Sequence, residues 1–265
     1  MRQNEQRLAW SKAGPALGEY DYYLRGLSLY LRFSVPDVLR ARAVWQEGLE
    51  RFPASALLRI KLAWSHLYLV MNGASTDPRD DIARAWRFAR EVAAADSLSP
   101  IATWALHWLM AFLLQWHDSD FVHSVAEARA AVALVPYDAL SRNDLSWILA
   151  NAGLGEEAVA WARAGLEHDP NGPAWFRSNL AWALYIAGRY QEALDTLGED
   201  GKDFVGMLAA TYVRLGRVDQ ARALVAAHLK AGGKDTVAQE AVYPLAEPHR
   251  TAYLDALRVA GLPER

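Results

Sequence analysis

The chain has 265 residues, 52% of them apolar, with 28 Lys and Arg against 31 Asp and Glu. This length and composition allow a large buried core, whereas a net charge of −3 without any basic block argues against nucleic acid as a partner. The lack of cysteine excludes disulfides, thiolate metal sites and cysteine catalysis.

The N-terminal residues 1–18 have charges on both sides of a short apolar patch and no secretory hydrophobic run. We expect a linker or extension here, and no signal peptide. The longest apolar stretch, residues 100–116, is shorter than the roughly 20 residues that span a bilayer, and it contains His107 and Gln115. It predicts a buried helix, so we expect no membrane partner and a cytoplasmic location.

A repeated tripeptide, Leu-x-Trp, organises the chain from residue 62 onward. It occurs at 62–64, 106–108, 145–147 and 180–182, with intervals of 44, 39 and 35 between its leucines. These intervals indicate a unit of about 34 residues with unequal insertions. The insertions fall in predicted turns, at 72–81 and 116–120. Six units are predicted, beginning near residues 20, 56, 100, 139, 174 and 202.

A second spacing marks the other half of each unit. A small residue is followed by another residue four positions on, a small residue three further and a proline five beyond, in the three sets Ala41, Trp45, Gly48, Pro53; Ser124, Ala128, Ala131, Pro136; and Ala158, Ala162, Gly165, Pro170. Such a stripe indicates a helix that packs closely on its neighbour and stops at the proline. Gly188 and Gly216 separate two helical runs, so each unit is predicted to be helix, turn, helix.

The segment 179–194, NLAWALYIAGRYQEAL, resembles the tetratricopeptide repeat (TPR), whose pattern combines W-x2-L-G-x2-Y with A-x3-F and a later proline. The resemblance implies an all-α, right-handed α-solenoid of about six helical hairpins over 19–265, closed by a capping helix at 249–260. The first three repeats depart from the pattern, because they lack the turn glycine. In the second of them, Ser97 stands where the proline would be.

Two short segments carry a narrower resemblance. YDYYLRG at 20–26 and YLDALRVAGLPE at 253–264 resemble the start and finish of the C-terminal TPR region of bacterial class III adenylate/guanylate cyclases. No segment resembles the paired metal-binding aspartates of the cyclase catalytic domain. The resemblance therefore implies a bacterial signalling protein's regulatory part, whose partner is a protein or peptide segment or its own upstream catalytic domain.

In the TPR frame the tryptophans of Leu-x-Trp face a concave groove. The candidate partner-binding residues are Trp64, Trp108, Asn143, Trp147, Asn179, Trp182 and Tyr185. Two interpretations stay open for each kind of side chain. The tryptophans either contact a ligand or only pack between helices. The asparagines either hold a peptide backbone, or bond between helices or cap them.

Other clusters favour structural roles. His117, Asp118, Asp120 and His123 are expected to be turn and N-cap residues, because their spacing matches no usual metal site. Neither 153–157 nor 232–235 has the spacing of a phosphate loop, and no catalytic set is found. We expect no metal, no cofactor and no enzyme, but a protein-interaction or regulatory module. The alternative is an effector sensor that binds a small molecule in the groove.

Overall fold

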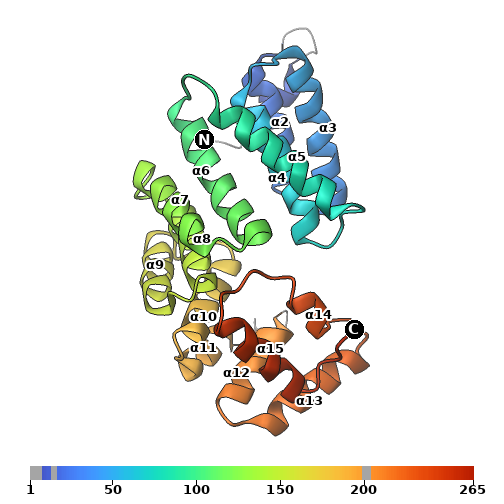
Figure 1. The fold of residues 1–265 in the computed structure, drawn as a ribbon, viewed down its shortest axis with the longest axis vertical. Coiled ribbons are helices and arrows are strands. Elements are labelled where there is room, and N and C mark those ends of the chain that lie inside the picture. Colours follow the sequence, from blue (N-terminus) through green and yellow to red (C-terminus); the bar gives the residue numbers. More distant parts are fainter. Residues whose placement is uncertain (1–7, 13–16, 199–203) are drawn as a thin grey trace. The chain divides into compact units, whose positions relative to one another are not determined.

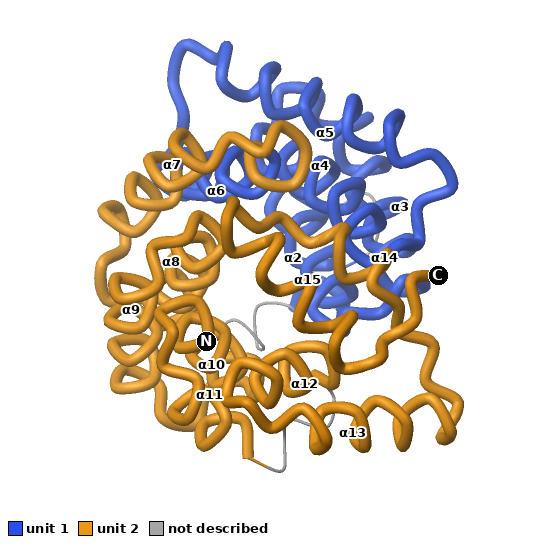
Figure 2. The backbone as a smooth tube through the Cα atoms, turned by 60° about the horizontal axis from the view of Figure 1, so that its bottom comes forward, with its two compact units in different colours: residues 1–113 blue, residues 114–265 orange. Residues whose placement is uncertain are grey.

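The computed structural model describes residues 8–12, 17–198 and 204–265, and all regular elements in these ranges are helices (Figure 1). The chain divides into two compact units, Met1–Leu113 and Leu114–Arg265 (Figure 2). None of the described helices is both long enough and apolar enough to cross a bilayer. The predicted all-α fold is confirmed.

The first unit consists of helices paired in chain order. Their bounds are α2 Glu19–Tyr30, α3 Val35–Arg51, α4 Ala56–Met71, α5 Pro78–Ala93 and α6 Pro100–Leu113. Helix α2 packs on α3, and α4 packs on α5. A Cβ at Gly26 would overlap the Trp45 indole, and a Cβ at Gly48 would lie 2.7 Å from Tyr22 Cβ. The small residues of the stripe therefore let these helices approach closely.

The second unit continues the same plan. Its elements are the π-helix η2 Leu114–Asp118, then α7 Phe121–Leu134, α8 Ala139–Asn151, α9 Gly155–His168, α10 Trp175–Ile186, α11 Tyr190–Leu197, α12 Val205–Arg214, α13 Val218–Lys230, α14 Val237–Glu240 and α15 His249–Val259. The predicted stripe residues Ala128, Ala131, Ala158 and Ala162 are fully buried. In chain order, the described helices from α2 to α13 make six successive pairs, the number predicted, although α6 and α7 belong to different units. The predicted start of the sixth, near 202, lies outside the described residues.

The turn between the two helices of a repeat takes a left-handed conformation both with and without glycine. Gly188 and Gly216 have φ of +77° and +75°, the left-handed conformation that ends a helix without steric cost only at glycine. Phe33 and Ser119 adopt the same conformation in the first and third repeats, with φ of +50° and +52°. In the first and third repeats the turn geometry is thus retained without glycine. The second repeat does have a left-handed turn glycine, Gly73 with φ of +62° just after α4, so the prediction that its turn glycine is missing is wrong.

The first insertion divides between the loop 72–77 and the start of α5, and the second forms a π-helical turn. Helix α4 continues to Met71, and α5 begins after Asp77, whose side chain accepts a hydrogen bond from the Asp80 backbone N–H at 3.1 Å. Residues 114–118 form the π-helical turn that follows α6, where a simple turn was expected. A π-turn accommodates extra residues within a helix and re-aims the side chains that follow.

The C-terminal segment returns onto the repeats. The predicted capping helix at 249–260 is confirmed as α15, which packs on α12 and buries Tyr253, Leu254 and Leu257. The short helix α14 was not predicted. Its first backbone N–H groups are hydrogen-bonded to the chain end, with 2.8 Å between Val237 N and Pro263 O.

Part of the predicted linker packs on α2. The Trp10 Nε1–H donates to Ser28 Oγ at 2.9 Å, and Arg25 donates to the Lys12 carbonyl at 2.6 Å. Residues 1–7 and 13–16 of the predicted linker lie outside the described residues.

Candidate functional site

A cavity of about 600 Å³ lies within the second unit. Three of the predicted groove residues line it: Trp147, Asn179 and Trp182. The start of α12 contributes Gly206 and Met207 to its wall. The cavity therefore combines side chains from three successive repeats.

Trp182 is held in place by neighbours on three sides. Its Nε1–H donates to Asn151 Oδ1 at 2.8 Å. Its ring stacks on Tyr185, with 5.5 Å between centroids and 3° between planes, and meets the Tyr253 ring edge-on at 5.2 Å. Tyr185 is buried and does not line the cavity, so it supports Trp182 from behind.

Trp147 is supported by the π-helical turn. Its ring stacks on Trp116, with 6.2 Å between centroids and 10° between planes. Trp116 in turn meets Tyr243 edge-on at 5.6 Å. The π-helical insertion in the third repeat thus positions Trp147, the Leu-x-Trp tryptophan of the fourth repeat.

The C-terminal segment forms the rest of the wall. Glu240, Tyr243 and Tyr253 line the cavity, and the Ala246 N–H donates to the Asn151 carbonyl at 2.8 Å. Sequence reasoning assigned this segment to capping alone and missed these three residues. The available signal was its aromatic content, because a cap needs a polar outer face and these tyrosines do not supply one.

The ionisable groups of the cavity are mainly acidic. Glu240 Oε2 accepts a hydrogen bond from the Tyr253 hydroxyl at 2.8 Å. Burial, and next the neighbouring Asp235, raise the pKa of Glu240 although the Tyr253 hydrogen bond opposes the shift. Asp235 is paired with His228. Burial and the nearby Glu240 also raise the pKa of Tyr253 well above its usual range, so its hydroxyl stays protonated.

The two predicted asparagines form a hydrogen bond with each other. Asn179 Nδ2 donates to Asn143 Oδ1 at 2.7 Å, and Asn143 Nδ2 donates to the Phe176 carbonyl at 3.3 Å. Asn143 is completely buried and does not line the cavity, whereas Asn179 does. This arrangement matches the alternative of bonding between helices.

The other two predicted tryptophans belong to the first unit and do not line the cavity. Trp64 meets Phe112 edge-on at 5.1 Å, and Phe112 also contacts Trp108 at 6.4 Å. Trp108 is only 4% exposed, and its indole N–H has no hydrogen-bond partner within the described part of the chain. These two residues pack as an aromatic cluster with Phe112.

The histidine and aspartate cluster forms local contacts. Asp120 caps α7 by accepting a hydrogen bond from the His123 backbone N–H at 3.1 Å, and its other oxygen contacts His123 Nδ1 at 2.7 Å. His117 pairs with Asp118. Within the ranges that the structure describes, no group of three or more His, Cys, Asp and Glu is placed to hold a metal ion.

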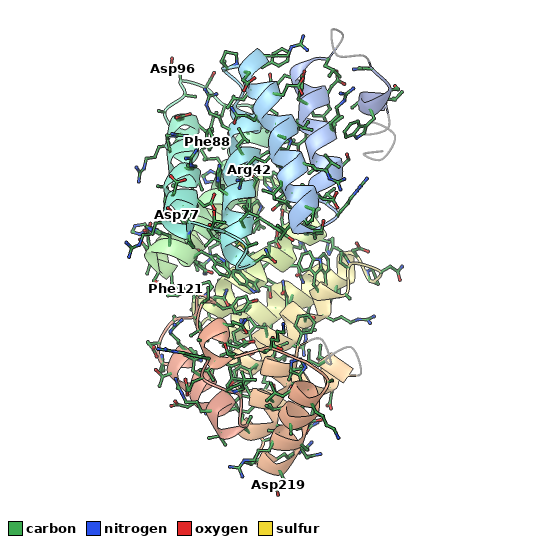
Figure 3. All side chains as sticks on the ribbon, turned by 90° about the vertical axis from the view of Figure 1, so that its right-hand side faces the viewer. Arg42, Asp77, Phe88, Asp96, Phe121 and Asp219 are labelled. Carbon is green, nitrogen blue, oxygen red and sulfur yellow. The ribbon has the colours of Figure 1, made fainter. Side chains whose placement is uncertain are left out.

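A buried polar network lies in the first unit, between α3, α4 and α5. His66 Nδ1 lies 2.5 Å from Asp81 Oδ1, and Arg42 donates to Ser65 Oγ at 2.9 Å (Figure 3 labels Arg42 and Phe88). Burial lowers the pKa of His66, whose ring stacks on Phe88 at 6.3 Å. The network joins three helices, and its residues do not line the cavity of the second unit.

Comparison with known proteins agrees with this architecture. Residues 174–199 match the profile of the family described as tetratricopeptide repeat. A chain of the APC/C hetero-tetramer Cut9-Hcn1 has a similar structure, with a TM-score of 0.62 at 15% identity over 98% of this chain and 46% of that one. Pseudomonas aeruginosa pilF gives a TM-score of 0.52 at 14% identity over 87% of this chain and 93% of that one.

The chain spans about half the length of the first of these structures, at 46%. No curated protein sequence matches it. At such low identities the structural likeness shows the fold alone. The described residues therefore have the fold of a TPR-like α-solenoid, and the family match covers one repeat, residues 174–199.

Proposed function

We propose that this chain is a non-catalytic interaction module that binds a segment of a partner protein in the cavity of its second unit. The observation that carries the proposal is the convergence of Trp147, Asn179 and Trp182, from successive repeats, with Tyr243 and Tyr253 on one cavity. Tryptophan and tyrosine that are held rigidly and line a cavity are typical anchors of protein interfaces. A structurally similar chain was solved within the APC/C hetero-tetramer Cut9-Hcn1, which supports a role in assembly.

The partner class follows from the sequence resemblance at 20–26 and 253–264. It favours a bacterial signalling protein in the cytoplasm, and a cyclase-like catalytic domain is the partner to test first. In the structure these two segments belong to α2 and α15, and α15 forms part of the cavity wall.

Selection from a random peptide library on the immobilised full chain tests the interaction role. We expect enriched peptides that bind the wild type and bind Trp147→Phe, Trp182→Phe and Asn179→Ala less tightly. Trp64→Phe is the matched control, because Trp64 occupies the same motif position in the first unit and does not line the cavity. An anchor tryptophan is worth about 1–2 kcal/mol or more of binding free energy. Failure to enrich any peptide, or equal affinity for all variants at intact fold, contradicts the proposal.

A small-molecule effector is the second candidate, and the cavity size favours it. Its volume of about 600 Å³ falls within the usual range for small-molecule sites. The C-terminal segment supplies a wall that a simple stack of hairpins lacks. Melting temperatures across a panel of metabolites and nucleotides test this role, because a ligand of the folded state stabilises it by mass action. A panel without any concentration-dependent shift counts against an effector.

A further inference from the structure

The cavity has the composition of a cation site. Resting on the proposed function, we propose that it binds the ammonium or guanidinium group of a Lys or Arg side chain of the partner segment, between the indoles of Trp147 and Trp182 and the carboxylate of Glu240. The part of the partner segment that binds in this cavity therefore carries a Lys or Arg side chain. Neither the repeat pattern nor the likeness to solved structures indicates this preference.

The aromatic side of the site suits a cation. Trp147 and Trp182 each have an aromatic neighbour stacked on one face, Trp116 and Tyr185 respectively, and each still lines the cavity. Tryptophan is the most favourable ring for cation–π attraction, and the attraction grows when the cation is desolvated. Tyr243 and Tyr253 add two further rings to the same lining.

Of the two carboxylates in the cavity lining, Asp235 is paired with His228, whereas Glu240 has no ion-pair partner among the described residues. Glu240 is half-buried and accepts one hydrogen bond, from the Tyr253 hydroxyl. Among the described residues no Lys, Arg or His forms an ion pair with it, and the residues that line the cavity include neither Lys nor Arg. A half-buried carboxylate without a counter-charge costs free energy, which a bound cation would offset.

Other ligand chemistries fit less well. Asp235 lines the same cavity, and its charge acts on Glu240. An acidic group would therefore face two carboxylates, and His228, the basic residue in the lining, is already paired with Asp235. A purely apolar group would fill the space between the indoles and leave Glu240 without a partner charge.

Gly206 keeps room for this carboxylate. A Cβ built on it would lie 2.8 Å from Glu240 Oε1 and 3.1 Å from the Tyr253 hydroxyl oxygen. Gly206→Ala would displace the carboxylate while leaving all charges unchanged. It is therefore a steric test of the same site that does not depend on altering Glu240.

A titration with three amino-acid amides tests the inference on the full chain. The probe is N-acetyl-L-lysine methylamide, with the norleucine amide as the uncharged match and the glutamate amide as the acidic one. The readout is the indole N–H signals of Trp147 and Trp182 in 15N-labelled protein, assigned by the Trp→Phe variants. We expect the lysine amide alone to give saturable shifts.

Glu240→Gln and Gly206→Ala should each weaken binding of the lysine amide. For Glu240→Gln we expect the affinity to fall by about tenfold or more, as for loss of a charged hydrogen bond. Glu247→Gln is the matched control, since Glu247 is exposed in the same segment and does not line the cavity. Equal binding of the norleucine amide, or unchanged affinity in both Glu240→Gln and Gly206→Ala, overturns the inference.

The two proposals fail in different ways. If library peptides bind and depend on Trp182, but replacing their Lys and Arg by norleucine leaves affinity unchanged, the cation site is wrong and the interaction role stands. If the lysine amide binds and depends on Glu240, but no peptide is enriched, the cation site stands and the interaction role is wrong.

Discussion

At the scale of the residue, Glu240 is a cavity carboxylate whose ionisation costs stability in the folded state. Its carboxylate is half-buried beside Asp235 and is hydrogen-bonded to Tyr253. A folded state rarely retains a group that destabilises it unless another requirement keeps it there. Its stability effect can be measured without knowledge of the ligand.

We predict that Glu240→Gln raises the melting temperature at neutral pH. The pKa of Glu240 is raised in the folded state by burial first and Asp235 second, so ionisation above the ordinary value of 4.5 costs stability. That cost is absent at low pH, where the carboxyl is protonated in both states. The gain from Gln should therefore shrink as the pH falls toward 4.5. Melting curves between neutral and acid pH measure it.

Glu167→Gln serves as the control for this prediction, because it removes the same charge at an exposed position of the same unit, outside the cavity lining. It should change the melting temperature little. A gain from Glu240→Gln that is independent of pH would contradict the assignment to ionisation.

The two cavity tryptophans should differ in what they contribute to stability. Trp182→Phe removes the donor to Asn151 Oδ1, and Asn151 is only 2% exposed, so a buried acceptor loses its partner. We predict a loss of about 1–3 kcal/mol of unfolding free energy. Trp147→Phe keeps an aromatic ring against Trp116 and should cost less. Urea unfolding of both variants makes the comparison, and a larger loss for Trp147→Phe would contradict it.

At the scale of the element, close contact between paired helices depends on small residues. Ala158 on α9 is fully buried, whereas Ala160 on the same helix is exposed. We predict that Ala158→Leu overpacks this contact and costs about 1–3 kcal/mol. Ala160→Leu, the matched control, should be nearly neutral. Chemical denaturation measures both, and equal effects would show that the stripe is not a packing interface.

Sequence periodicity predicted the helix pairs because each is a local pattern of small and apolar residues. Periodicity fails where a local backbone conformation has no characteristic residue. Phe33 takes the left-handed turn conformation without glycine, so no sequence signal marked that turn, whereas Ser119 lies in the turn predicted at 116–120. The π-helical form of residues 114–118 was not marked, because its effect is to place Trp116 against Trp147 rather than to change composition.

At the scale of the whole molecule, the candidate site depends on a return of the chain that no repeat pattern contains. Trp147, Asn179 and Trp182 were identified from the repeat frame, and all three line the cavity. Glu240, Tyr243 and Tyr253 reach the same cavity from the C-terminal segment. Contacts between segments so far apart in sequence arise from tertiary packing, which single-sequence periodicity does not encode.

Energetic coupling along such a chain is expected to be local, because each repeat contacts mainly its neighbours. Leu58 in α4 and Leu257 in α15 are both fully buried, one in each unit. We predict that Leu58→Ala and Leu257→Ala each cost about 2–5 kcal/mol, but in different places. Hydrogen exchange measured by mass spectrometry should show protection lost first in α2–α5 for Leu58→Ala and in α12–α15 for Leu257→Ala. Each variant serves as the other's control, and equal loss of protection in all six helix pairs for either variant would show that the chain unfolds as one cooperative unit.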